Sequence, residues 1–262
     1  MNYNYFYLIT IQYLGFRYHG WQKQPQLKTL HLAIDKTLNF IFDRKKTFKT
    51  LATGRTDAMV SANETAIELF MEEPILDFGV FLEQFNYYLP QDIRVLSMVE
   101  VDAEFNVIQD ATMKEYVYVF SHGQKAHPFC ASIMTTFRDA LDVELMKTGA
   151  KLFEGTHNFK GYCSKVSENG KYIRTIDFCE IEDNKMFSAS FFPDTSYVFK
   201  VRGEGFGHNQ IRMMMGTLVR LGNNEITLDY ISKSLEVEST EVMEYIAPAS
   251  GLILNKVEFG HK

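Results

Sequence analysis

The chain has 262 residues, enough for one large domain or two medium ones, and its 46% hydrophobic and 23% charged residues argue against intrinsic disorder. A formal net charge of -6 is a poor match to a generic nucleic-acid-binding protein, so an RNA-binding function requires a local basic patch. The three cysteines are far apart, which excludes a CxxC metal motif and suggests reduced thiols in the cytoplasm. The sequence shows neither a signal peptide nor a long apolar run, so we expect a cytoplasmic protein without a membrane span.

Alternating strand and helix patterns fill the first hundred residues. The predicted elements, in order, are a strand over 4–13, a loop over 15–25, a helix from Thr29, a strand ending at Thr53, a strand over 64–71, a helix capped by Asp77 and a strand over 93–101. This order is that of a ferredoxin-like unit.

A similar order of elements follows in the second half. The predictions are strands over 114–121, 174–182, 187–192, 197–202 and 251–259, helices over 141–153 and 210–221, and two short helices capped by Thr227 and Ser239. We place a boundary near Glu104, which divides the chain into an N-terminal half, 1–104, and a C-terminal half, 105–262.

The most informative segment is Gly-Arg-Thr-Asp-Ala at 54–58, a tight turn between two predicted strands. An aspartate in such a turn, here Asp57 with Arg55 beside it, can act as a nucleophile or a base. The commoner role is structural, because a turn aspartate usually caps the backbone and a nearby arginine is usually solvated. The local pattern alone favours the structural role.

Four further segments change this balance. In addition to GRTDAMVSA at 54–62, the chain contains YLGFRYHGWQKQP at 13–25, KEYVY at 114–118, GEGFGHNQIRMMMG at 203–216 and APASGL at 247–252. In order and spacing the five resemble the motifs of TruA-type tRNA pseudouridine synthases. The resemblance runs from about Tyr13 to Val257, nearly the whole chain.

The resemblance implies an α+β fold in which two ferredoxin-like halves form one extended, mainly antiparallel sheet with a central cleft. It implies an enzyme that isomerises uridine to pseudouridine in tRNA: the C1′–N1 bond is cleaved, and the rotated uracil is rejoined through C5. No cofactor or metal is expected, because the released base is recaptured. Bacterial members of the family modify positions 38, 39 and 40 of the anticodon stem-loop and often act as homodimers.

The resemblance also assigns roles to four residues. Asp57 matches the essential carboxylate, which either attacks C1′ or removes the C2′ proton. Arg55 is expected to hold Asp57 and to fill the gap left by the flipped nucleotide. Tyr116 is expected to stack on the target uracil, although a core strand aromatic is the alternative. Arg212 is expected to pair with Asp57 rather than lie in solvent, because its apolar neighbours indicate partial burial.

Basic residues within or beside the motifs can form the patch that RNA binding requires. Lys200 and Arg202 alternate on one face of a predicted strand, which suits them to phosphates. The residues predicted to contact RNA are Arg17, Lys23, Gln22, Lys200 and Arg202. Arg55, Arg174 and Arg212 extend the predicted basic patch.

Three departures from the family pattern leave the target open. Met59 stands where glycine is usual, residues 105–110 lack a basic residue of the family, and Gly207 replaces an apolar residue. A paralogue with another uridine target is therefore an alternative, as is a catalytically inactive RNA-binding protein on the same fold. The intact set of four catalytic candidates argues against inactivity. A small-molecule enzyme with an aspartate nucleophile lacks supporting motifs such as a phosphate-binding loop.

Overall fold

The computed structural model describes residues 3–260, which form two compact units. The first unit extends to Thr112 and takes up the chain again from Leu254, and the second comprises Met113–Ile253. Within the described residues, ten strands belong to a large, mainly antiparallel sheet, and five α-helices accompany them. The predicted α+β class with a mainly antiparallel sheet is confirmed. The division at residue 104 and the central cleft remain predictions.

The first unit has the predicted β-α-β-β-α-β order. Its elements are β1 (Tyr5–Tyr13), a 3₁₀ turn η1 (Gly15–Arg17), α1 (Leu30–Ile41), β2 (Phe48–Ala52), β3 (Ser61–Met71), α2 (Phe78–Tyr88), β4 (Ile93–Val101) and the last strand β10 (Leu252–Phe259). β1 lies between β4 and β3, and β2 pairs with β3, all antiparallel. The neighbours β4-β1-β3, with β2 also paired to β3, match the order 4-1-3-2 of a ferredoxin-like unit, and β10 is a further neighbour of β3.

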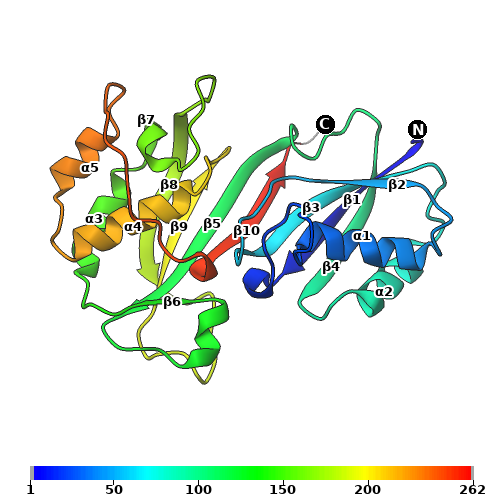
Figure 1. Cartoon of the computed structure of the whole chain (residues 1–262), viewed down its shortest axis with the longest axis horizontal. Coiled ribbons are helices and arrows are strands. Elements are labelled where there is room, and N and C mark those ends of the chain that lie inside the picture. The colour runs from blue at the N-terminus through cyan, green and yellow to red at the C-terminus, as the bar shows by residue number, and fades with distance from the viewer. Residues whose placement is uncertain (1–2, 261–262) are drawn as a thin grey trace. The chain divides into compact units, whose positions relative to one another are not determined.

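Helices α1 and α2 cover one face of these strands (Figure 1). Alternate residues of β1, among them Ile9 and Ile11, are buried beneath them, as the period of two in a half-buried strand requires. The Asp77 carboxylate accepts a hydrogen bond from the Val80 N–H (3.0 Å), which confirms the predicted cap of α2.

The second unit begins within β5 and carries the remaining elements. These are β5 (Ala111–His122), η2 (Pro128–Ser132), β6 (Thr135–Phe137), α3 (Val143–Lys151), β7 (Gly155–Asn158), η3 (Lys160–Tyr162), β8 (Ile173–Asp183), β9 (Tyr197–Gly203), α4 (Gln210–Gly222), α5 (Leu228–Ser234) and η4 (Ala249–Gly251). β5, β9, β8 and β7 follow one another as antiparallel neighbours, while β6 pairs with β5 in parallel.

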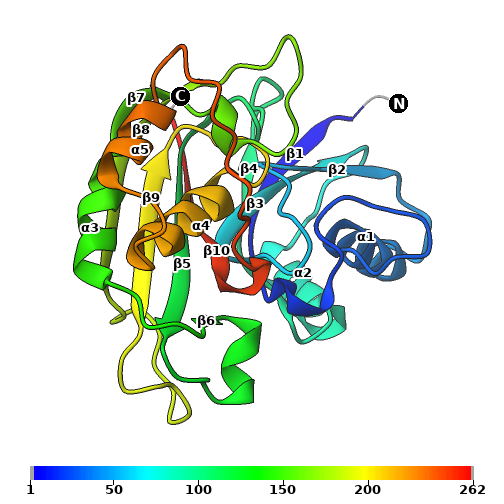
Figure 2. The same ribbon diagram turned by 60° about the vertical axis from the view of Figure 1, so that its left-hand side comes forward.

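Helices α3 and α4 pack against each other in this unit (Figure 2). Gly149 of α3 lies so close to α4 that an added Cβ would fall 2.3 Å from a methyl carbon of Leu221. Almost all of α4 is buried, which explains the apolar sequence of residues 210–221. The Thr227 hydroxyl accepts a hydrogen bond from the Tyr230 N–H (3.3 Å), so the predicted cap of α5 is confirmed.

The predicted strand over 187–192 is wrong: the segment is an irregular loop. The Asn184 side chain accepts hydrogen bonds from two following backbone N–H groups, one of them Phe187, and holds the chain in a turn. Phe187, Phe191 and Phe192 pack against a buried cluster that includes Cys130 and Met134. Their aromatic character reflects burial rather than strand pairing.

The predicted short helix after Ser239 is also wrong, because residues 240–248 are not helical. Tertiary partners take the backbone donors of this segment: Met243 N–H donates to the Gly161 carbonyl oxygen (2.9 Å) and Ala247 N–H to that of Arg212 (3.1 Å). The segment packs tightly on α4, where a Cβ on Gly216 would fall 2.1 Å from the Tyr245 carbonyl oxygen. In residues 3–260, no helix is long and apolar enough to cross a membrane.

Candidate active site

The turn that carries Asp57 lies between β2 and β3 and is fixed to the first-strand loop of the same unit. The Thr56 hydroxyl shares a hydrogen bond with the Tyr13 hydroxyl (2.9 Å), and its carbonyl oxygen accepts one from the Trp21 N–H (3.0 Å). Met59 N–H donates to the Tyr18 carbonyl oxygen (3.1 Å). Two of the five sequence motifs, 13–25 and 54–62, therefore meet through hydrogen bonds directly beside the candidate catalytic carboxylate.

The two loops approach each other too closely for a side chain at residue 20. Gly20 has φ +86°, and a Cβ there would lie 2.9 Å from the Thr56 carbonyl oxygen and 3.1 Å from the Asp57 carbonyl carbon. Val60 N–H donates to the Asp57 carbonyl oxygen (3.2 Å), which closes the turn. Asp57 is half-buried and Arg55, two residues earlier, is exposed. The main chain of Asp57 is thus held on both sides.

Tyr116 lies on β5 in the second unit, opposite Val201 of β9. Its ring makes an edge-to-face contact with Phe206, with ring centroids 5.3 Å apart at 85°. Phe206 belongs to the motif at 203–216, so this contact joins two motifs that are about ninety residues apart. Tyr116 is half-buried rather than part of the fully buried core.

Arg212 lies in the first turn of α4 and is half-buried, as its apolar neighbours predict. Its Nε donates to the Ala247 carbonyl oxygen (2.7 Å), and its Nη1 donates to the Asn209 Oδ1 (3.0 Å). Asn209 precedes α4 with φ 61°, a left-handed conformation that asparagine tolerates better than most residues. These two contacts, made by different nitrogens of the guanidinium, fix the orientation of its plane.

Sequence reasoning missed Asn209 and Ala247 as partners of Arg212. The signal for Asn209 was its position before a helix, where asparagine is a preferred residue. The signal for Ala247 was only its presence in the last motif, because a carbonyl partner can follow any residue type.

A second contact ties the last motif to the motif at 114–118. The Tyr118 hydroxyl donates to the Pro248 carbonyl oxygen (2.7 Å) and contacts the Thr135 Oγ1 (2.9 Å). Tyr118 is fully buried, and burial raises the pKa of its hydroxyl, so the group stays protonated and acts as a donor. Three motifs of the second unit thus converge around Tyr116 and Arg212.

Three of the residues predicted to contact RNA pair with carboxylates of this chain. Arg17 binds Asp92 (2.7 Å), Lys23 binds Asp35, and Lys200 binds Glu182. Gln22 is exposed and Arg202 is half-buried on β9. Outside this set, Arg174 donates from Nη1 to the Gly205 carbonyl oxygen (3.2 Å). A phosphate that binds at the three paired cations must compete with a carboxylate.

The structure places the candidate residues in two sets. Asp57 and Arg55 share one turn of the first unit, and Tyr116 and Arg212 lie in the second unit. There Tyr116 contacts Phe206 of the motif at 203–216, and Arg212 donates to Ala247 of the motif at 247–252. Among residues 3–260, no group of three or more His, Cys, Asp or Glu side chains is arranged to hold a metal ion.

The ferredoxin-like unit and the motif contacts define an α+β protein of the pseudouridine synthase class, and a family model described as tRNA pseudouridine synthase matches residues 150–260. Similar proteins named tRNA pseudouridine synthase A cover nearly the whole chain. One from Exiguobacterium sibiricum is 33% identical over 95% of this chain and 94% of its own length. Others from Brachyspira hyodysenteriae and Streptococcus pneumoniae are each 30% identical, over 96% and 97% of this chain and 97% and 98% of their own lengths. The chain belongs to the tRNA pseudouridine synthase A family.

Proposed function

We propose that this protein isomerises uridine to pseudouridine in tRNA, with Asp57 as the essential carboxylate. The observation that carries the proposal is the combination of full-length similarity to proteins named tRNA pseudouridine synthase A with an Asp57 turn held by backbone hydrogen bonds. A catalytic group must be fixed within fractions of an ångström, and a carboxylate at the tip of a rigid turn meets that requirement.

The chemistry needs no net addition to the base. The C1′–N1 bond of the target uridine breaks, the uracil turns within the site and C5 bonds to C1′. C5 then loses its proton and N1 gains one, so the product is an isomer of the substrate. Asp57 either attacks C1′ and leaves it again when C5 bonds there, or takes the C2′ proton and later returns it. Both roles require an anion in a site that excludes bulk water. No cofactor or metal enters the proposal, because the released base is recaptured.

The other three candidate residues hold the target nucleotide and balance the charge of Asp57. Tyr116 stacks its ring on the uracil, in an orientation supported by the edge-to-face contact with Phe206. Arg212 pairs with Asp57, and its contacts with Ala247 and Asn209 prepare its guanidinium for an anion. Arg55, which is exposed, fills the place of the flipped nucleotide.

We further propose that the target uridines lie at positions 38, 39 and 40 of the anticodon stem-loop, and that the enzyme is a cytoplasmic homodimer. These finer assignments rest on the resemblance of the motifs to the family. Light scattering on the purified protein tests the dimer: a mass of about twice the 30.3 kDa chain supports it and a monomeric mass contradicts it.

The direct test is tritium release from tRNA transcripts labelled at uridine C5, followed by mapping of the modified positions. We expect release of tritium and modification confined to positions 38–40. Tight tRNA binding without tritium release contradicts the enzyme and supports an RNA-binding protein on the same fold. Release with modification elsewhere keeps the activity and contradicts the anticodon assignment.

A further inference from the structure

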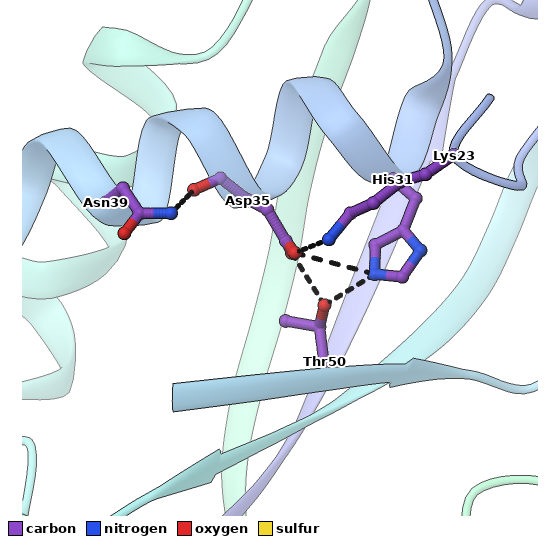
Figure 3. Close-up of polar contacts among 5 residues, drawn as sticks. All are labelled: Lys23, His31, Asp35, Asn39 and Thr50. Atoms are coloured by element: carbon purple, nitrogen blue, oxygen red, sulfur yellow. Dashed lines mark hydrogen bonds and ion pairs between the residues drawn. The ribbon is translucent and has the colours of Figure 1, made fainter. Parts of the chain in front are cut away.

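A polar network in the first unit joins α1 to β2 and to the first-strand loop. Figure 3 shows the side chains of Lys23, His31 and Thr50 directed toward the Asp35 carboxylate. The Asp35 carboxylate accepts a hydrogen bond from the Thr50 hydroxyl (2.6 Å) and forms an ion pair with Lys23. His31 Nε2 lies 2.9 Å from the Thr50 Oγ1 and 3.6 Å from an Asp35 oxygen.

The network fixes the tautomer of His31. The Thr50 hydroxyl gives its one proton to Asp35, so it must accept a hydrogen bond from the Nε2–H of His31. Burial lowers the pKa of the His31 imidazole, and its buried Nδ1 has no hydrogen-bonding partner within residues 3–260, so the ring carries its single proton on Nε2. The imidazole is therefore neutral and held in one orientation from its Nε2 edge.

The oriented ring of His31 stacks on Trp21. The centroids of the two rings are 5.7 Å apart, with an interplanar angle of 22°. The Tyr13 ring contacts Trp21 in a tilted arrangement, with ring centroids 6.1 Å apart. The backbone N–H of His31 also donates to the Trp21 carbonyl oxygen (3.1 Å). Trp21 is only 3% exposed, so its position is set by these neighbours.

Trp21 in turn touches the main chain beside Asp57. The Trp21 backbone N–H donates to the Thr56 carbonyl oxygen (3.0 Å), and the adjacent Gly20 lies against the Thr56–Asp57 peptide with no space for a Cβ. A displacement of Trp21 therefore moves the peptide that precedes Asp57. A shift of about 1 Å at a catalytic group is enough to cost roughly a hundredfold in rate.

We propose that His31 is a positioning residue for Asp57, acting through its ring stack on Trp21, while Thr50, Asp35 and Lys23 hold the imidazole. The inference rests on the proposed function, since it takes Asp57 as the catalytic carboxylate. The four polar residues act on the Asp57 turn through Trp21 and Thr56, because His31 stacks on Trp21 and the Trp21 backbone N–H donates to the Thr56 carbonyl oxygen.

The kinetic test compares His31→Ala, which removes the stacked ring, with His31→Phe, which restores a ring but cannot donate to Thr50. We expect His31→Ala to lower kcat for tritium release by about tenfold or more, with KM for tRNA within about threefold. His31→Phe should recover most of the lost kcat. Asn39→Ala is the matched control on the same helix, because Asn39 donates only to the backbone carbonyl oxygen of Asp35.

A spectroscopic readout follows from the sequence, because Trp21 is the one tryptophan in the chain. Its fluorescence therefore reports this site without interference from another tryptophan. We expect His31→Ala to shift the emission to longer wavelength as water reaches the indole, while His31→Phe and Asn39→Ala leave the emission as in the wild type. The melting temperature of each variant separates these effects from unfolding.

Two results overturn the inference: an unchanged kcat in a folded His31→Ala variant, or an equal loss of kcat in His31→Ala and His31→Phe. Asp57→Asn, assayed in parallel, separates this failure from failure of the proposed function. If Asp57→Asn is inactive and His31→Ala is fully active, only the positioning role is wrong. If Asp57→Asn is as active as the wild type, the catalytic assignment itself is wrong.

Discussion

Met59 occupies a backbone conformation that methionine rarely adopts, with φ 67° at the end of the Asp57 turn. The sequence motif indicated that glycine is usual there, and the structure gives the physical reason. A left-handed conformation costs a residue with a Cβ roughly 1–2 kcal/mol, whereas glycine adopts it freely. The turn keeps its shape because Met59 N–H is bonded to the Tyr18 carbonyl oxygen.

Met59→Gly should therefore raise the free energy of unfolding by about 0.5 kcal/mol, although it removes a side chain. The gain is the relieved backbone strain less the greater entropy of glycine in the unfolded chain. Chemical denaturation measures it. Met59→Ala is the control, because it shortens the side chain and keeps the strain, so it should give no gain. A Met59→Gly variant less stable than Met59→Ala would contradict the account.

The variant Arg212→Lys tests whether activity requires an oriented guanidinium group or only a positive charge at residue 212. Arg212→Lys keeps the charge but cannot reach both the Ala247 oxygen and the Asn209 Oδ1. We expect initial rates of tritium release to fall by about tenfold or more with little change in melting temperature. Arg220→Lys, on the same helix, should retain activity close to the wild type. Equal activity of the two variants would show that the orientation of Arg212 is unimportant.

At the scale of elements, β3 holds the segment that follows β4 through one buried carboxylate. Glu68 is fully buried, and its Oε2 accepts the Val107 N–H (3.0 Å), while its buried Oε1 has no hydrogen-bonding partner among residues 3–260. Burial raises the pKa of Glu68, and the nearby Asp110 charge adds to the effect. The stretch 105–110, which departs from the family pattern, is thus anchored to the sheet.

The sign of the pH effect follows from the raised pKa. The folded protein binds the Glu68 proton more tightly than the unfolded chain, so this group stabilises the fold at low pH, and the contribution is lost as pH rises through the raised pKa. Glu68→Gln keeps an acceptor for Val107 without the buried charge. We expect it to be more stable than the wild type by about 1 kcal/mol at pH 7, with the difference vanishing near about pH 4.

Thermal melts across this pH range measure the difference. Glu72→Gln, an exposed change just beyond β3, is the matched control and should show no such trend. A Glu68→Gln variant that is less stable than the wild type at every pH would contradict the account.

The elements also show how far sequence patterns predict this fold. The first unit followed its periodicity closely, because its helices carry one apolar face and its strands alternate. The failures lie where tertiary contacts override local preference. The loop at 187–192 is held by the Asn184 side chain, and the segment at 240–248 gives its backbone donors to Gly161 and Arg212.

The sequence predicted the candidate site residues through their motifs, and the structure shows contacts between those motifs. Tyr13, Gly20 and Trp21 support the Asp57 turn, a role that no local pattern in 13–25 reveals. His31 lies outside all five motifs, and the sequence does not show its contacts with Trp21 and Thr50.

At the scale of the whole molecule, a net charge of -6 must be reconciled with a tRNA substrate. Arg17, Lys23 and Lys200 are each paired with a carboxylate, so phosphates bind them only by displacing or sharing that partner. We expect tRNA binding to weaken by tenfold or more between roughly 50 and 200 mM salt, because phosphate contacts release counterions.

Lys200→Ala should weaken the binding of all tRNA sequences to a similar extent. It should also lower the slope of log binding constant against log salt concentration by about one unit, because one phosphate contact is lost. Filter binding over a salt series measures the slope. Lys233→Ala is the control: Lys233 is exposed on α5 and paired with Asp229 (2.6 Å), outside the predicted RNA contacts. Identical slopes for the two variants would remove Lys200 from the RNA surface.

The central claim is that the Asp57 carboxylate performs the isomerisation. Its most direct measurement is the single-turnover rate of pseudouridine formation in a tRNA transcript by the wild type and by Asp57→Asn, with tRNA affinity measured alongside. We predict a loss of about a thousandfold or more in rate while the affinity stays within about tenfold, since the amide keeps the size of the side chain without its charge. An Asp57→Asn enzyme that forms pseudouridine within twofold of the wild-type rate would contradict the account.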